Sequence, residues 1–173
     1  RDGLCRFDAL CNAVGRSLMS LKQFYYHCDE FDKKYDITNQ FSRTYFSIFK
    51  DEKNDKYDNI FSYILDGTGK YQTKYIEQNY LSPSDLTGCC AFIAFNEIHT
   101  WAVRRSNKNK DIWVELDGNI RFIHPGKTVS FMGAILIYPK KSEKSDMDEE
   151  KPVSRTQMKK QKREERKQRI MTK

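Results

Sequence analysis

Apolar residues in the first half of the chain recur mainly with the spacing of α-helices. In the opening segment they stand at the i, i+3 and i+4 positions that give a helix one buried face. This stripe consists of Leu4, Phe7, Leu10, Cys11 and Val14. We predict a first helix over residues 5 to about 20, and residues 21–27 as a second short helix or a bent extension of the first.

The stretch 28–58 is rich in Asp, Lys, Asn and aromatic residues, and the helical patterns from there to residue 80 are shorter. We predict helices near 44–51, over 57–65 and over 70–80, with a turn at 66–69. That turn, Asp-Gly-Thr-Gly, lacks the Gly-Lys-Ser/Thr ending of a phosphate-binding loop and follows no buried strand. The sequence therefore disfavours a phosphate site there.

The pattern changes after Pro83. Short runs rich in β-branched and aromatic residues, separated by polar turns such as 106–110, predict strands at 89–95, 99–105, 111–116 and 131–138. We expect these strands to form an antiparallel meander. Helices first and strands afterwards predict an α+β fold, in which an N-terminal helical half packs on a C-terminal antiparallel sheet and the cleft between them can hold a site.

Charge is concentrated at the end of the chain. The 173 residues carry a net charge of +7, and residues 139–173 hold 13 Lys and Arg against 7 Asp and Glu, which accounts for +6 of it. We predict one domain over 1–139 and a charged, largely disordered basic tail over 140–173. Residues 155–173 are basic enough for weak contact with nucleic acid, but they contain no aromatic residue to stack on bases.

The five cysteines, at positions 5, 11, 28, 89 and 90, are odd in number and have no regular spacing. Neither a CxxC pair nor a His-x3-His spacing occurs, so we expect no disulfide framework, no structural zinc and no cofactor. This usage predicts an intracellular, reducing compartment, the cytoplasm or the nucleus. The sequence shows neither a signal peptide nor an apolar run of roughly 18 to 20 residues, so we expect no membrane partner.

Cys5 is the first candidate for chemistry. The turn-forming Asp2-Gly3 pair places this cysteine in the first turn of the predicted helix, where unpaired amide groups and a partial positive charge favour a thiolate. The backbone N–H of Cys5 and the turn formed by Asp2, Gly3 and Leu4 are candidates for holding an oxyanion. The alternative is that Cys5 is a small buried residue, as most free cysteines are.

A nucleophilic cysteine also needs a histidine and an orienting group. If the strands at 99–105 and 111–116 pair around the loop 106–110, residues whose numbers sum to about 216 face each other, which places His99 opposite Asp117. The carboxylate would then fix the ring tautomer while the other nitrogen faces the thiol. Taken singly, His99 fits a structural histidine and Asp117 a turn residue, but the order Cys, His, Asp favours a catalytic triad.

Two segments resemble known families. Residues 2–10 (DGLCRFDAL) resemble the cysteine box of OTU-type deubiquitinases, and residues 99–104 (HTWAVR), with Trp113 and Asp117, are similar to the histidine and acid strands of papain-like cysteine peptidases. The resemblance implies a papain-like (OTU-like) fold and cleavage of peptide or isopeptide bonds, in ubiquitin-type conjugates or in a viral or mobile-element polyprotein. OTU-type enzymes usually carry an aromatic residue directly after the histidine and often take their acid two residues after it. This chain has Thr100 and Trp101 at those places, so the acid is expected at Asp117, as in papain-like enzymes.

Two other functions stay open. The chain is alternatively a catalytically inactive peptidase fold that serves as a binding module, in which case Cys5 is inert toward alkylation. It is alternatively a nucleic-acid-associated protein that acts through its basic tail. We interpret His27 and His124 as structural, and Trp101 and Trp113 as sheet packing, although Trp113 lies on the strand face that would let it shield the predicted His-Asp pair.

Overall fold

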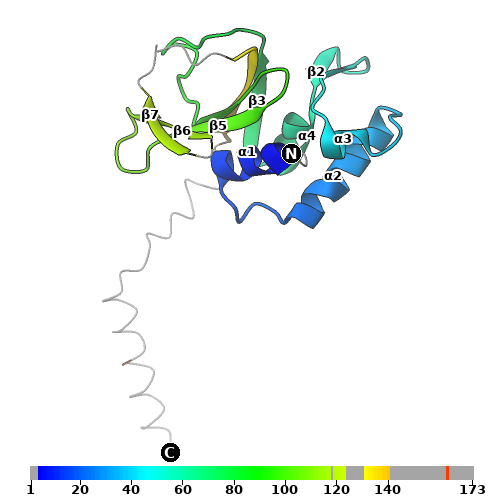
Figure 1. Cartoon of the computed structure of the whole chain (residues 1–173), viewed down its shortest axis with the longest axis horizontal. Helices are drawn as coiled ribbons and strands as arrows, with labels where there is room; N and C mark the ends of the chain where they lie inside the picture. The colour runs from blue at the N-terminus through cyan, green and yellow to red at the C-terminus, as the bar shows by residue number, and fades with distance from the viewer. Residues whose placement is uncertain (1–3, 118, 124–130, 141–162, 164–173) are drawn as a thin grey trace, which may run out of the picture. The chain divides into compact units, whose positions relative to one another are not determined.

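The computed structural model describes residues 4–117, 119–123 and 131–140, together with Arg163 (Figure 1). The chain divides into two compact units, residues 1–140 and residues 141–173, and all described residues except Arg163 belong to the first. The predicted basic tail, with its stretch 155–173, therefore lies almost entirely outside the described residues, and so does His124.

The first unit has an α+β fold, as the sequence predicts, and its helices come before most of its strands. The elements of the N-terminal half are α1 (Leu4–Val14), α2 (Leu21–Lys34), α3 (Phe41–Thr44), β1 (Phe49–Asp51), β2 (Lys56–Asp58) and α4 (Ile60–Gly67). The strands β1 and β2 pair with each other as a separate antiparallel hairpin, which the sequence pattern did not predict.

The other strands form one six-stranded sheet in which every described pairing is antiparallel. They are β3 (Tyr71–Ile76), β4 (Ala91–Phe95), β5 (Thr100–Arg105), β6 (Trp113–Asp117), β7 (Asn119–Ile123) and β8 (Gly133–Pro139). Their order across the sheet is β3-β8-β4-β5-β6-β7. The predicted meander is confirmed for β4 to β6 and continues into β7, but β8 returns across the sheet to lie between β3 and β4.

Local signals fix where the first two helices end and begin. Gly15 has a φ of +108°, a conformation that residues with a side chain rarely adopt, so α1 stops there and the prediction of a helix to about residue 20 is wrong. Ser20 and Gln23 form a capping box that starts α2. That helix runs to Lys34, so the predicted segment 21–27 is its first half.

Two predicted helices are wrong, and a third is displaced. The segment predicted as a helix at 70–80 contains β3. In this strand half-buried Tyr71, Thr73 and Tyr75 are separated by exposed Gln72 and Lys74, the period of a strand. The segment 44–51 holds the end of α3 and all of β1 instead of a helix. The helix predicted over 57–65 begins at Ile60, because the Asn59 side chain accepts the N–H of Ser62 and caps it.

Both faces of the sheet are buried. Helices α1, α2 and α4 pack on one face, where the core includes Leu10, Phe24, Phe61, Ile93 and Ile135. The segment between β3 and β4, together with Phe131, two residues before β8, covers the other face. There Leu81, Leu86 and Phe131 pack against Phe92 and Trp113. The Phe95 ring lies so close to the backbone of Gly133 in β8 that a Cβ there would be 2.6 Å from its Cζ atom.

Candidate active site

His99 and Asp117 form a hydrogen-bonded pair. His99 immediately precedes β5, Asp117 is the last residue of β6, and the His99 Nε2 lies 2.5 Å from the Asp117 Oδ1. Both side chains remain open to solvent, with exposed fractions of 37% and 42%. The structure thus brings together two of the three residues that the sequence singled out.

The register that brings them together differs from the predicted one by two residues. Ala102 lies opposite Leu116 and Val103 opposite Glu115, so paired numbers sum to 218 instead of about 216. The loop closes later than expected, because the Asn109 side chain and carbonyl accept the N–H groups of the two residues before β6. Since a two-residue shift leaves each side chain on the same face, His99 and Asp117 meet diagonally instead of directly.

The backbone of His99 is fixed by a tight turn between β4 and β5. The Asn96 Oδ1 accepts the N–H of Ile98 at 3.0 Å and that of His99 at 2.8 Å. The N–H of Asn96 in turn donates to the carbonyl of His99 at 3.0 Å. The sequence analysis missed this role of Asn96, although an Asn at the start of a short turn is a known local signal.

The imidazole of His99 also stacks on the ring of Trp101. The ring centroids lie 5.6 Å apart at an interplanar angle of 16°, and Trp101 itself is buried. Trp101 is thus more than sheet packing, because it covers one face of the imidazole. The signal was present in the sequence, since residues two apart on a strand share a face. Trp113, by contrast, packs against Phe92 in the core.

Cys5 lies in the first turn of α1 and is half-buried. The next residue, Arg6, is buried, and its guanidinium donates hydrogen bonds to the backbone carbonyls of Ser42, Arg43 and Tyr45. Burial lowers the pKa of Arg6, and the Cys28 and Cys5 thiols lie close enough to act on its charge. Arg6 therefore anchors the start of α1, with Cys5, to the segment 42–45.

That anchor places the start of α1 near the His99 end of the sheet. The segment 42–45 continues into Phe46, whose ring lies 4.8 Å from the ring of Phe95. Phe95 ends β4 and pairs with Thr100, the residue after His99. A chain of contacts thus joins Arg6 to the residues next to His99.

The C-terminal end of α1 supports the same orientation of the helix on the sheet. Val14 and Gly15 line a pocket of about 500 Å³ together with Arg105 and Ser106, at the far end of β5. A helix of 11 residues is about 16 Å long, and a strand of six residues spans about 20 Å. Since α1 packs on β4 and β5, it runs along β5 and begins near the end where His99 stands.

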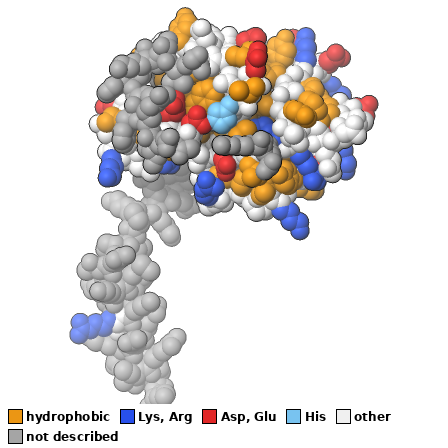
Figure 2. Space-filling model, in the orientation of Figure 1, with side chains coloured by type: hydrophobic (Ala, Val, Ile, Leu, Met, Phe, Trp, Pro, Cys, Tyr) orange, Lys and Arg blue, Asp and Glu red, His pale blue; other side chains and the backbone are white. Residues whose placement is uncertain are grey.

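No hydrogen bond joins Cys5 to His99 among the described residues. Catalytic hydrogen bonds are often long in the absence of substrate, so this geometry leaves Cys5 as a candidate. Asp2 and Gly3 of the predicted oxyanion turn lie outside the described residues, while Leu4 is the first residue of α1 and is exposed. Figure 2 shows a face on which hydrophobic and acidic side chains lie beside a histidine.

Burial affects the titration of the other four thiols. Burial raises the pKa of Cys28 to about 12 and that of Cys89 to about 11. Burial also raises the pKa values of Cys11 and Cys90. All five cysteines are free. These four thiols therefore stay protonated near neutral pH.

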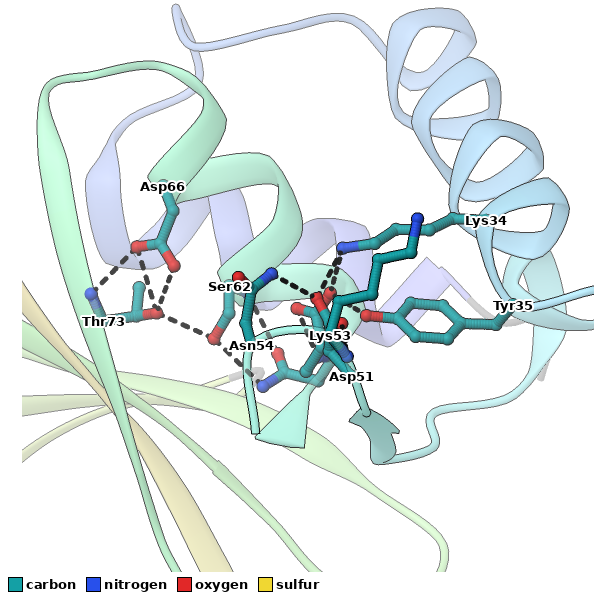
Figure 3. Close-up of polar contacts among 10 residues, drawn as sticks. Lys34, Tyr35, Asp51, Lys53, Asn54, Ser62, Asp66 and Thr73 are labelled. Atoms are coloured by element: carbon teal, nitrogen blue, oxygen red, sulfur yellow. Dashed lines mark hydrogen bonds and ion pairs between the residues drawn. The ribbon is translucent and has the colours of Figure 1, made fainter. Parts of the chain in front are cut away.

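A second polar cluster lies where the hairpin β1–β2 meets the end of α2 (Figure 3). Lys34 Nζ lies 3.4 Å from Asp51 and 3.3 Å from Asp58, and the Tyr35 hydroxyl donates to Asp58. Burial and this hydrogen bond raise the pKa of Tyr35 to about 12. On the α4 side of the view, the Thr73 hydroxyl joins Ser62 at 2.7 Å. These bonds hold the hairpin and β3 in place.

The part of the chain that the structure describes holds no group of three or more His, Cys, Asp or Glu side chains able to bind a metal ion. None of its helices is long and apolar enough to cross a membrane. Comparison of the chain with models of protein families, with curated proteins and with solved structures finds no match. Any functional assignment therefore rests on the chemistry and geometry of the residues.

Proposed function

We propose that the protein is a thiol-dependent hydrolase, a cysteine peptidase in which Cys5, His99 and Asp117 form a catalytic triad. The observation that carries the proposal is the 2.5 Å hydrogen bond between His99 and Asp117. An imidazole that is half-exposed, stacked on an aromatic ring and held by a carboxylate at the end of a strand suits acid–base catalysis.

The hydrogen bond assigns roles to the two ring nitrogens. In the proposed tautomer the Nε2–H donates a hydrogen bond to the Asp117 carboxylate, so the neutral ring presents its Nδ1 nitrogen as the base. Nδ1 accepts the Cys5 proton, and the thiolate attacks the carbonyl carbon of the scissile bond. The charged imidazole then returns this proton to the leaving amine, and the C–N bond breaks to give a thioester. Water, deprotonated by His99, hydrolyses the thioester and frees the acid and the thiol.

The oxyanion of each tetrahedral intermediate needs donors beside Cys5. Backbone N–H groups in the first turn of a helix have no partner within the helix and lie at the positive end of its dipole. Cys5 occupies this first turn in α1. Its own N–H, with the N–H groups of Asp2, Gly3 and Leu4 before it, is thus the proposed oxyanion site.

The same proposal covers the fold family and the substrate. We place the chain among papain-like peptidases of the OTU-like kind, on the resemblance of residues 2–10 and 99–104 and on the presence of a helix with the cysteine in its first turn. The substrate is then a protein that offers a peptide or isopeptide bond, as in a ubiquitin-type conjugate or a polyprotein. The proposed setting is the reducing interior of a cell, where the thiol stays free.

One experiment tests the class and the nucleophile together. The chain is incubated with a probe that carries an electrophile at the C-terminus of ubiquitin, and the modified residue is mapped by mass spectrometry. We expect one adduct, on Cys5, and none in the Cys5→Ala or His99→Ala variants. The matched control is Cys11→Ala on the same helix, which should react like the parent.

The inactive binding module is the second candidate, since no hydrogen bond joins Cys5 to His99 among the described residues. It predicts that the chain binds ubiquitin without forming an adduct. A general thiol reagent separates the cases further: reaction of Cys5 at the rate of free cysteine, unaffected by His99→Ala, would show that no base activates the thiol. That result would overturn the proposed triad.

A further inference from the structure

Large hydrophobic side chains are exposed at one end of the sheet. The described residues include seven such side chains: Leu4, Tyr26, Tyr45, Tyr57, Tyr80, Ile98 and Met132. Ile98 is the most exposed of them, at 91%. Single exposed apolar residues are ordinary, but several at one place mark a binding surface.

Four of the seven lie near the candidate triad. Leu4 precedes Cys5, and the carbonyl of Tyr45 accepts a hydrogen bond from Arg6. Ile98 precedes His99, and the N–H of Met132 donates to the carbonyl of Phe95, which ends β4 beside the turn to His99. We call Leu4, Tyr45, Ile98 and Met132 the apolar rim.

Ile98 occupies a fixed place in this rim. Its N–H and that of His99 both donate to the Asn96 Oδ1, so the backbone that carries Ile98 is tied to the backbone that carries the imidazole. The Ile98 side chain nevertheless makes almost no contact with the rest of the protein, given its 91% exposure. A rigid, solvent-facing isoleucine adds nothing to the core, and it keeps apolar surface available next to the proposed base.

We infer that Ile98 is a specificity residue that binds an apolar side chain on the leaving-amine side of the scissile bond. The inference rests on the proposed function, in which His99 protonates the leaving nitrogen. When the scissile bond is a peptide bond, the residue that carries this nitrogen must pass close to the imidazole, and therefore close to Ile98. Burial of an isoleucine side chain in such a contact favours an apolar over a polar substrate by about tenfold.

The test is a digestion of a peptide library derived from a whole proteome, with the cut sites read by mass spectrometry. We expect the parent to cut preferentially before Leu, Ile, Val or Phe, compared with Ser or Asp. Ile98→Ser should lower that preference about tenfold, and Ile98→Leu should keep it. The matched control is Tyr57→Ser, which removes another exposed side chain from β2 and should leave the preference unchanged.

A binding measurement separates failure of this inference from failure of the proposed function. The Cys5→Ala chain is titrated, by NMR, with Gly-Gly-Leu-Gly-Gly and with Gly-Gly-Ser-Gly-Gly. One outcome is that the parent shows no cleavage while the Leu peptide still binds more tightly than the Ser peptide in an Ile98-dependent way. That result would refute the proposed peptidase activity and support the apolar site. If the parent cuts through Cys5 but Ile98→Ser keeps the preference, or no preference exists, Ile98 has no such role.

Discussion

Replacement of Asp117 by Asn tests the pair on which the proposed mechanism depends. Asn keeps a carbonyl oxygen that can accept a hydrogen bond from the Nε2–H of His99, but the substitution removes the negative charge that stabilises the imidazolium. A hydrogen bond to a charged group contributes about 1.5 to 3 kcal/mol. The His99 and Asp117 side chains are 37% and 42% exposed, so solvent screening reduces this to about 1.5 to 2 kcal/mol.

That energy corresponds to a loss of about 10- to 30-fold in kcat. The assay compares initial rates of parent and variant on the same fluorogenic peptide or ubiquitin substrate at saturating concentration, with thermal unfolding as the check on folding. Asp111→Asn is the matched control, because it makes the same change at an exposed residue just before β6, on the opposite end of the hairpin.

The reasoning fails if Asp117→Asn turns over as fast as the parent, or loses no more than Asp111→Asn. In that case the hydrogen bond seen in the structure does not act in the reaction. If Asp8→Asn were inactive instead, the acid would come from the cysteine segment, and the role given to the second half of the chain would be wrong.

Two further outcomes follow from the titrating groups. Iodoacetamide at neutral pH should alkylate Cys5 first, because burial raises the pKa of Cys28 to about 12 and that of Cys89 to about 11. Peptide mass mapping identifies the labelled cysteine. Labelling of Cys28 or Cys89 before Cys5 would contradict their burial. The hydrogen bond from Arg43 lowers the pKa of Asp29 below its ordinary value of 3.8. Asp29 therefore adds stability that is present above pH 3.8 and is lost as the pH falls through the lowered pKa. Asp29→Asn should melt below the parent at pH 6 and approach it near pH 2, and an equal gap at both values would exclude this linkage.

The sequence predicted β4 to β6 well because their apolar runs are bounded by polar turns that do not fit a helix. It failed at β3, where Tyr71 and Tyr75 are four residues apart and satisfy a helical pattern as well as a strand pattern. Only the pairing with β8, whose residues lie 58 to 68 positions further along the chain, decides between them. Long-range contacts of this kind are absent from local spacing.

The candidate site also contains residues that local patterns predict and a residue whose role depends on long-range contacts. His99 and Asp117 were predicted from strand pairing, and the two-residue error in register did no harm because it preserves the face. The role of Arg6 could not be predicted, because its partners are backbone carbonyls 36 to 39 residues away and carry no sequence signal. An arginine is seldom fully buried, so its burial would not be expected from the sequence.

The position of β8 in the sheet sets the order in which the protein can be completed during synthesis. β8 is the last strand of the sheet in the chain, yet it lies between β3 and β4 and is buried from Gly133 to Ile137. Until it emerges from the ribosome, β3 and β4 each lack the neighbour that joins them, and the hydrophobic surfaces on both faces stay open. The sheet that supports His99 therefore closes only after residue 139 has been made, so a nascent chain shorter than this should be inactive even though it already contains all three residues of the proposed triad.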